Sequence, residues 1–164
     1  MQQQARKFLD ETIVPTLSKL DMNSEHAALL LLGTVAQESR FYHRTQLGGG
    51  PAKGLYQVEL LTARDITDRY LKNRHSTRLK FNTAVGLDPN TIWATVPDYF
   101  MLTLLQFNDM FGTAIARLKY WMVPEELPKD VPGYAKYWKT YYNTPLGKGT
   151  EEEFIENWNK LVVG

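Results

Sequence analysis

Apolar residues recur along most of the chain at spacings of three and four, which predicts helices, whereas the alternation typical of strands is scarce. The longest apolar stretch runs from Ala27 to Ala36, within the segment HAALLLLGTVAQES. Because this segment is apolar nearly all round, it predicts a central helix that neighbouring helices bury. Asn23 or Ser24 stands where the N-cap of that helix is expected.

The same periodicity predicts helices before and after the central one. The first runs from about Gln4 to Leu20, and Pro15 is expected to bend or split it. A long apolar helix, YFMLTLLQFNDMFGTAIARLKYW, begins after Pro97 and is expected to be interrupted near Gly112. The segment LLTARDITDRYLK predicts an amphipathic helix. Its inward-facing residues are predicted to be Leu61, Ile66, Tyr70 and Leu71.

Two further helices are predicted in GYAKYWKTYYN and TEEEFIENWNKLV, and Thr150 with Glu153 has the spacing of a capping box. Glycine and proline mark residues 44–53, NTAVGLDPNT and VPEELPKDVP as connections. The fold predicted is therefore all-α, a single domain over residues 1–164, with about seven helices around one buried helix.

The amino-acid composition and charge indicate which binding partners are not expected. The 164 residues are 43% hydrophobic and 23% charged, as in an ordinary globular domain. The formal net charge is +1 and no block of like charges occurs, so neither nucleic acid nor an anionic membrane is expected as a partner. The longest apolar stretch is far shorter than the roughly 20 residues of a membrane span, so no membrane insertion is expected. No apolar signal region opens the chain, so we expect it to stay in the compartment where it is made.

Metal and disulfide chemistry are also not expected. There is no cysteine, so disulfides and thiolate metal sites are excluded. The three histidines, His26, His43 and His75, do not form the His-Glu-x-x-His spacing of a zinc site.

Glu38 stands where the apolar helix gives way to polar residues, and from His26 to Gln37 there is no charged residue. Burial there would raise the pKa of the carboxyl, whereas a helix C-terminus contributes only about 0.3–1 kcal/mol. Arg40 or Arg44, if close by, would lower that pKa again. A protonated carboxyl in a cleft is the general acid that glycosidic cleavage requires. The alternative is a glutamate that merely ends a helix in solvent.

Residues 48–50 are three consecutive glycines, which indicate either a flexible loop or a glycine-rich wall. A phosphate-binding loop is excluded, because Lys53 precedes Gly54 and no Gly-Lys-Ser/Thr follows. Ser39 lacks the Gly-x-Ser-x-Gly frame of a nucleophile elbow.

Two motifs in this region occur in a fixed order. Glu38-Ser39-x-Phe41 is followed about a dozen residues later by PAKGLYQVELLTA. This pair resembles the soluble lytic transglycosylase and goose-type lysozyme family, which has Glu-Ser-x-Phe and then Gly-Ala-x-Gly-Leu-Met-Gln near a Thr-Ala pair. The Gly-Leu-Tyr-Gln-x-Glu variant and the tail YAKYWKTYYNTPLGKGTEEEFIENW are similar to phage-encoded lysozyme-like proteins, over nearly the whole chain.

The resemblance implies a lysozyme-like domain that cleaves the MurNAc–GlcNAc glycan strand of peptidoglycan, with no cofactor. It implies that Glu38 is the catalytic acid and then the base. Ser39 and Gln57 would hold substrate or orient the acid. The wall of the sugar groove would be formed by Gly54, Leu55 and Tyr56, and the missing Cβ of Gly54 would let backbone approach the glycan.

A second carboxylate would distinguish two mechanisms. A retaining hydrolase places it about 5–5.5 Å from the first, and an inverting one about 6.5–9.5 Å away. Glu59 and Asp65 are the nearest candidates, although Asp65 also fits a solvated helix face. In a lytic transglycosylase the 6-hydroxyl of the sugar attacks and no second acid is needed. We favour this mechanism because the motif supplies one acid.

One departure from the family favours a rival function. The family has a later Ala-Tyr-Asn-Ala-Gly segment, where this chain has ARLKYW at residues 116–121, and Tyr120 would supply the aromatic hydroxyl. The rival is a structural tail or portal component of a phage virion that keeps the fold with little or no activity. An aromatic cluster at residues 134–142 predicts a core stripe, or rings that stack on sugars or contact a virion protein. Both functions imply a phage product in the virion or in the host before release.

Overall fold

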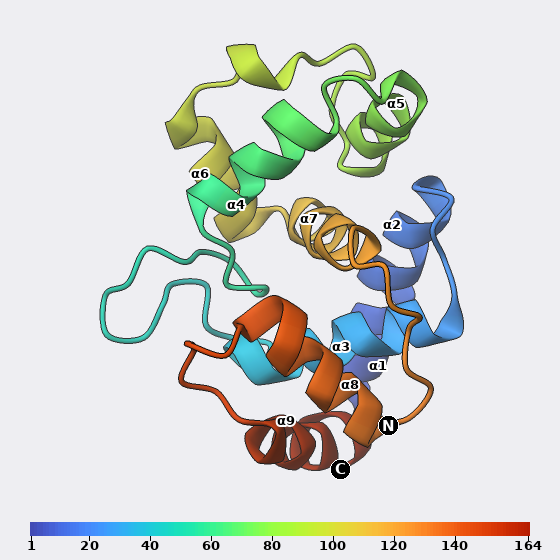
Figure 1. The fold of residues 1–164 in the computed structure, drawn as a ribbon, viewed down its shortest axis with the longest axis vertical. Helices are drawn as coiled ribbons and strands as arrows, with labels where there is room; N and C mark the ends of the chain where they lie inside the picture. Colours follow the sequence, from blue (N-terminus) through green and yellow to red (C-terminus); the bar gives the residue numbers. More distant parts are fainter.

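The computed structural model describes residues 1–164, and its regular structure is helical with no strand, which confirms the all-α class (Figure 1). Eight helices are present, four of which continue from an α-helical part into a wider π-helical part. They are α1–η1–α2 (Gln3–Phe8, Leu9–Ile13, Val14–Lys19), α3 (Glu25–Ser39), α4–η2 (Leu60–Arg64, Asp65–Tyr70), α5 (His75–Ala84), α6 (Asp98–Phe107), α7 (Asp109–Trp121), α8–η4 (Val131–Trp138, Lys139–Asn143) and α9–η5 (Glu151–Asn157, Trp158–Val163). A single 3₁₀ turn, η3 (Trp93–Thr95), lies between α5 and α6.

The first helix stays continuous despite Pro15. A proline removes one backbone hydrogen bond, and its ring crowds the carbonyl of the preceding turn. The turn directly before Pro15 opens into the π-helical segment η1, which is wide enough to accommodate the ring. The helix therefore changes its winding where the sequence predicts a bend.

Helix α3 is buried by its neighbours, as predicted, although α7 and not α3 crosses the middle of the molecule (Figure 1). The N-cap of α3 is Ser24, whose hydroxyl accepts a hydrogen bond from the Ala27 N–H at 3.1 Å. It contacts α7, α8 and α9, and most of its residues are fully buried. They belong to one hydrophobic cluster of 39 buried residues that draws on every helix.

The last helix also begins as predicted. The Thr150 hydroxyl accepts from the Glu153 N–H at 3.2 Å, and the Glu153 carboxylate accepts from the Thr150 N–H at 2.9 Å. Both halves of the capping box are therefore present.

The prediction that Leu61 faces the core is wrong, since its side chain is 79% exposed. Ile66 and Leu71 are buried as expected, and Tyr70 is half-buried. Ile66 is five positions after Leu61, which places the two about 140° apart around a helix at 3.6 residues per turn. The inward position in the first turn belongs instead to Ala63.

The long apolar segment is interrupted at Asn108, and the prediction of a break near Gly112 is wrong. Asn108 has an extended backbone, and its side chain accepts a hydrogen bond from the Phe111 N–H at 3.0 Å, which makes it the N-cap of α7. Gly112 lies within α7, where an added Cβ would lie 3.0 Å from the Tyr56 ring. The glycine thus allows close packing of Tyr56 on α7 and does not end a helix.

Helix α7 crosses the middle of the molecule, with α4, α5 and α6 on one side and α3, α8 and α9 on the other (Figure 1). The chain between α3 and α4 projects to one side, and the connection after η4 lies on the same side (Figure 1). This side holds the candidate site. No helix in the structure combines the length and the apolarity that crossing a lipid bilayer requires.

Candidate active site

Glu38 occupies the last turn of α3, and the chain reverses immediately after it. Arg40 and Phe41 both adopt left-handed backbone conformations, with φ of 53° and 62°. The buried Phe41 ring packs edge-on against Phe8, with centroids 5.8 Å apart. Phe41 of the Glu-Ser-x-Phe motif therefore anchors the reversal that brings the following loop back beside Glu38.

The Glu38 side chain is half-buried and lines a cleft of about 590 Å³. One wall is the loop of residues 43–59 together with Thr62, the other is formed by residues 142–149, and Lys119 reaches in from α7. The lining residues are Glu38, His43, Thr45, Gln46, Leu47, Ala52, Gln57, Val58, Glu59, Thr62, Lys119, Tyr142, Asn143, Leu146, Gly147, Lys148 and Gly149.

The Glu38 carboxyl is held by Trp138, the last residue of α8. The indole Nε1–H of Trp138 donates to Oε1 of Glu38 at 2.8 Å, and the Trp138 side chain is almost fully buried. An indole N–H can only donate, so Oε1 acts as an acceptor here. When the carboxyl is protonated, this hydrogen bond favours the proton on Oε2.

Burial raises the pKa of Glu38 from 4.5 to about 7, and this is the largest influence on it. The Trp138 hydrogen bond and the Lys119 ammonium both act in the opposite direction. Near neutral pH, protonated and charged forms are therefore both populated, as an acid that must also act as a base requires.

Lys119 lies between the two walls and, with Lys148, is one of two lysines in the cleft lining that sequence reasoning missed. Its ammonium donates to the Tyr142 carbonyl at 3.0 Å and lies 4.2 Å from the centre of the Tyr142 ring. Burial lowers the pKa of Lys119, whereas the carboxylates of Glu38 and Glu59 raise it. The cleft thus contains one ammonium within electrostatic reach of two carboxyl groups.

Gln57 and Glu59 are the two predicted residues that share the cleft with Glu38. Gln57 has a positive φ of 47°, and its Nε2 donates to the Gly54 carbonyl at 2.9 Å. Glu59 is exposed at the N-cap of α4. The structure therefore brings one of the two candidate second carboxylates to the same cleft as Glu38.

Asp65, the other candidate, lies on the surface of η2 outside the cleft. It accepts from Arg69 one turn away at 2.6 Å, and this hydrogen bond holds the pKa of Asp65 below its usual value. It fits the solvated helix face that the sequence left open.

Gly54, Leu55 and Tyr56 lie behind the cleft wall and do not line it. Gly54 has φ of 76°, and an added Cβ would collide with the carbonyl oxygen of Leu105 in α6. The group that lies close to Gly54 is therefore the backbone of α6. The sequence predicts a bound glycan at that position instead. The Tyr56 hydroxyl is hydrogen-bonded with the Thr113 hydroxyl at 3.0 Å, and burial raises its pKa.

Ser39 and Tyr120 are also buried and do not reach the cleft. The Ser39 hydroxyl donates to the Val35 carbonyl at 3.1 Å, within its own helix. The Tyr120 hydroxyl is hydrogen-bonded with the Thr34 hydroxyl at 2.9 Å, and burial raises its pKa well above the usual value. Both side chains support the helices that carry Glu38 and Lys119 and offer no group to a ligand in the cleft.

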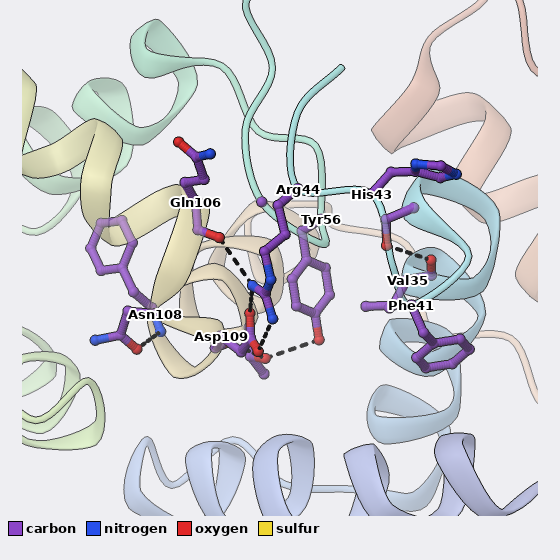
Figure 2. A network of polar contacts seen from close by, with 12 residues as sticks. Val35, Phe41, His43, Arg44, Tyr56, Gln106, Asn108 and Asp109 are labelled. Carbon is purple, nitrogen blue, oxygen red and sulfur yellow. Dashed lines mark hydrogen bonds and ion pairs between the residues drawn. The ribbon is translucent and has the colours of Figure 1, made fainter. Parts of the chain in front are cut away.

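Arg44 fixes the loop wall to the start of α7. Its guanidinium donates to both carboxylate oxygens of Asp109, at 2.7 and 3.0 Å, and to the Gln106 carbonyl at 3.0 Å. Figure 2 shows the guanidinium between these two residues, beside the Tyr56 ring. The Arg44 carbonyl in turn accepts from the Gly54 N–H at 2.8 Å. Since Arg44 is held by Asp109, it does not contribute to the pKa of Glu38.

Tyr142 joins the two walls at the back of the cleft. Its hydroxyl donates to the Tyr56 carbonyl at 2.6 Å, while its own carbonyl accepts from Lys119. Together with Tyr134, Tyr137 and Trp138 it is buried, so most of the predicted aromatic cluster is a core stripe. Within that stripe, only Trp138 makes a hydrogen bond to Glu38.

Comparison of the chain with models of protein families, with curated protein sequences and with solved structures gave no match. No group of three or more His, Asp or Glu side chains is arranged to hold a metal ion. Any assignment of function therefore depends on the cleft and on what its residues can do chemically.

Proposed function

We propose that this protein cleaves the MurNAc–GlcNAc β-1,4 bond of peptidoglycan, with Glu38 as the catalytic acid and base. The observation that carries the proposal is the Glu38 carboxyl itself. It lines an open cleft, accepts a hydrogen bond from Trp138, and has a pKa of about 7. A carboxyl that is protonated near neutral pH is what departure of an alcohol from a sugar requires.

The reaction follows from the two states of this carboxyl. Protonated Glu38 donates from Oε2 to the glycosidic oxygen while the bond from that oxygen to the anomeric carbon breaks. The resulting carboxylate then accepts a proton from the hydroxyl that attacks the anomeric carbon. In a lytic transglycosylase this is the 6-hydroxyl of the same sugar, which gives a 1,6-anhydro product.

The position of Glu59 is also compatible with hydrolysis of the same bond, in place of transglycosylation. It lies in the cleft with Glu38, so it is available to activate a water molecule or to stabilise positive charge on the sugar ring. A transglycosylase would not depend on it. Products and a Glu59→Gln variant therefore separate the two mechanisms.

A second candidate function is supported by exposed apolar side chains on α4 and α6. On α6, Tyr99 and Phe107 are 74% and 63% exposed, and Leu61 of the neighbouring α4 is 79% exposed. Large apolar side chains left in solvent on neighbouring helices are a feature of proteins that contact other proteins. They favour a structural component of a phage tail or portal complex, with or without activity in the cleft.

The decisive experiment compares clearing of purified peptidoglycan by the wild type and by Glu38→Gln. We expect the variant to lose at least about 100-fold in rate, because the amide cannot donate a proton as the acid does. Glu156→Gln, the same change at an exposed position of α9, serves as the control. Equal clearing by Glu38→Gln would overturn the catalytic proposal and leave the structural candidate.

Mass spectrometry of the released fragments identifies the mechanism. Anhydro-MurNAc ends that form equally well with Glu59→Gln support the transglycosylase. Reducing MurNAc ends that are lost with Glu59→Gln indicate hydrolysis with two carboxylates.

A further inference from the structure

Arg117, in the middle of α7, is a buried cation without a counterion. Its side chain is only 5% exposed, and its Nε donates to the Met22 carbonyl at 3.1 Å. That is its only hydrogen bond, and no carboxylate lies within ion-pair distance of it. Both terminal nitrogens of the guanidinium therefore have no partner within the protein.

This arrangement leaves hydrogen-bond donors of a charged group free. Burial lowers the pKa of Arg117, but an arginine remains charged across the accessible pH range. Thr16 Oγ1 is the only buried side-chain polar atom without a partner, so the terminal nitrogens of Arg117 reach water through the pocket that they line, and an anion bound there would replace this water. Arg117 thus has unused capacity for two parallel hydrogen bonds to one anion.

The guanidinium lines a pocket of about 230 Å³ that shares no residue with the Glu38 cleft. Its walls are largely apolar and come from α7, from the connection after it, and from α8. They are formed by Tyr120, Trp121, Val123, Leu127 and Tyr137. The Trp121 ring lies 5.0 Å from the guanidinium carbon and is about half exposed, at the mouth of the pocket.

Glu125 adds a negative charge to the rim of this pocket. Its position is fixed by its backbone, since its carbonyl accepts from the Tyr137 hydroxyl at 3.0 Å. A ligand with one negative charge directed at Arg117 is compatible with this rim, whereas a second charge near Glu125 would be repelled.

We propose that the Arg117 pocket binds a small organic carboxylate that carries an apolar or aromatic body. The carboxylate would accept two hydrogen bonds from the terminal nitrogens of Arg117, as the fork geometry of arginine favours. The body would lie between Trp121 and the apolar wall of Val123 and Leu127, removing apolar surface from water. This site is independent of the proposed cleavage reaction.

The test is a nuclear magnetic resonance titration of the full chain with phenylacetate. The indole signal of Trp121 and the Nε–H signal of Arg117 should shift and saturate. Two other probes define the ligand class. The neutral analogue 2-phenylacetamide and inorganic phosphate should each bind at least about 10-fold more weakly than phenylacetate. Absence of saturation with phenylacetate, or equal binding of either other probe, would overturn the proposal.

Variants test whether phenylacetate binds in the Arg117 pocket. Arg117→Gln should abolish saturable binding of phenylacetate, and Arg74→Gln should leave it unchanged. Arg74 is the matched control because it also stacks on an aromatic ring, 4.0 Å from the centre of Tyr70, but is exposed. If Arg117→Gln does not fold, Trp121→Ala, at a half-exposed position, should still weaken binding at least threefold. Unchanged binding in a folded Arg117→Gln or in Trp121→Ala would refute the site.

Discussion

In the folded chain the Glu38 carboxyl is harder to ionise than in the unfolded chain, which links stability to pH. The folded pKa is about 7 and the unfolded value is 4.5. Below pH 4.5 both states are protonated. Between the two values the folded state keeps a proton that the unfolded state has lost, so the free energy of unfolding falls as the pH rises. The total loss is roughly 3 kcal/mol, reached above pH 7.

Glu38→Gln should therefore be stabilised relative to the wild type at alkaline pH. Because glutamine stays neutral, the difference in unfolding free energy between variant and wild type should grow by roughly 3 kcal/mol from pH 4 to pH 8. Urea unfolding at the two pH values measures it, with Glu156→Gln as the control for the substitution. If the difference in unfolding free energy between Glu38→Gln and the wild type is the same at both pH values, burial does not raise the pKa of the Glu38 carboxyl.

Trp138→Phe should move the pH profile of activity. The indole hydrogen bond stabilises the Glu38 carboxylate and lowers its pKa, so its removal raises that pKa further. Activity that needs protonated Glu38 should then persist to higher pH, and the alkaline limb of kcat/KM should shift upward.

Trp121→Phe is the control for that shift, because Trp121 lies in the Arg117 pocket and not in the Glu38 cleft. If the alkaline limb of kcat/KM does not shift in Trp138→Phe, the indole does not lower the pKa of the Glu38 carboxyl.

At the scale of elements, Gly54 connects the loop wall to α6. Gly54→Ala should destabilise the fold by about 3 kcal/mol or more, because a left-handed conformation and a collision with the Leu105 carbonyl add together. Gly48→Ala is the matched control. Gly48 has a similar φ of 84° but open space around it, so only about 1–2 kcal/mol of backbone strain is expected. Urea unfolding measures both, and equal effects would rule out the contact with α6.

Elements with a strong apolar period could be predicted from the sequence. Helix α3, its cap at Ser24 and the capping box of α9 follow from local patterns. The sequence predicts a connection at NTAVGLDPNT, whose first three residues belong to helix α5, and of that helix only Phe81, Asn82 and Ala84 are buried. Its register is fixed by tertiary contacts, such as the bond from the Trp93 indole to Asn82 at 2.8 Å, which no local pattern indicates.

At the scale of the whole molecule, the cleft depends on residues far apart along the chain. Glu38 could be singled out because it follows an apolar helix within a motif. Trp138 lies 100 residues away and looks like any aromatic core residue until the fold places its N–H on the carboxyl. Lys119 is one of two cations in an apolar helix, and no local pattern distinguishes it. Only the packing of α3 against α7 and α8 brings the three together.

A bound glycan should contact both walls of the cleft. In hydrogen-exchange measurements on Glu38→Gln, peptidoglycan glycan fragments should protect residues 43–59 and residues 142–149, since both segments line the cleft. Residues of α5, which do not line the cleft, serve as the internal control. Protection confined to one wall, or to α6, would contradict binding in the cleft.

The reversal after Glu38 has a consequence for the entropy of ligand binding. Arg40 and Phe41 are non-glycine residues in the left-handed region, and Phe41 is locked by burial. Further along the same loop, Arg44 is held by Asp109. A segment so restricted has few conformations to lose, so ordering it adds little to the free-energy cost of association. The stretch from Arg40 to Arg44, from which the loop wall of the cleft extends, is therefore preorganised.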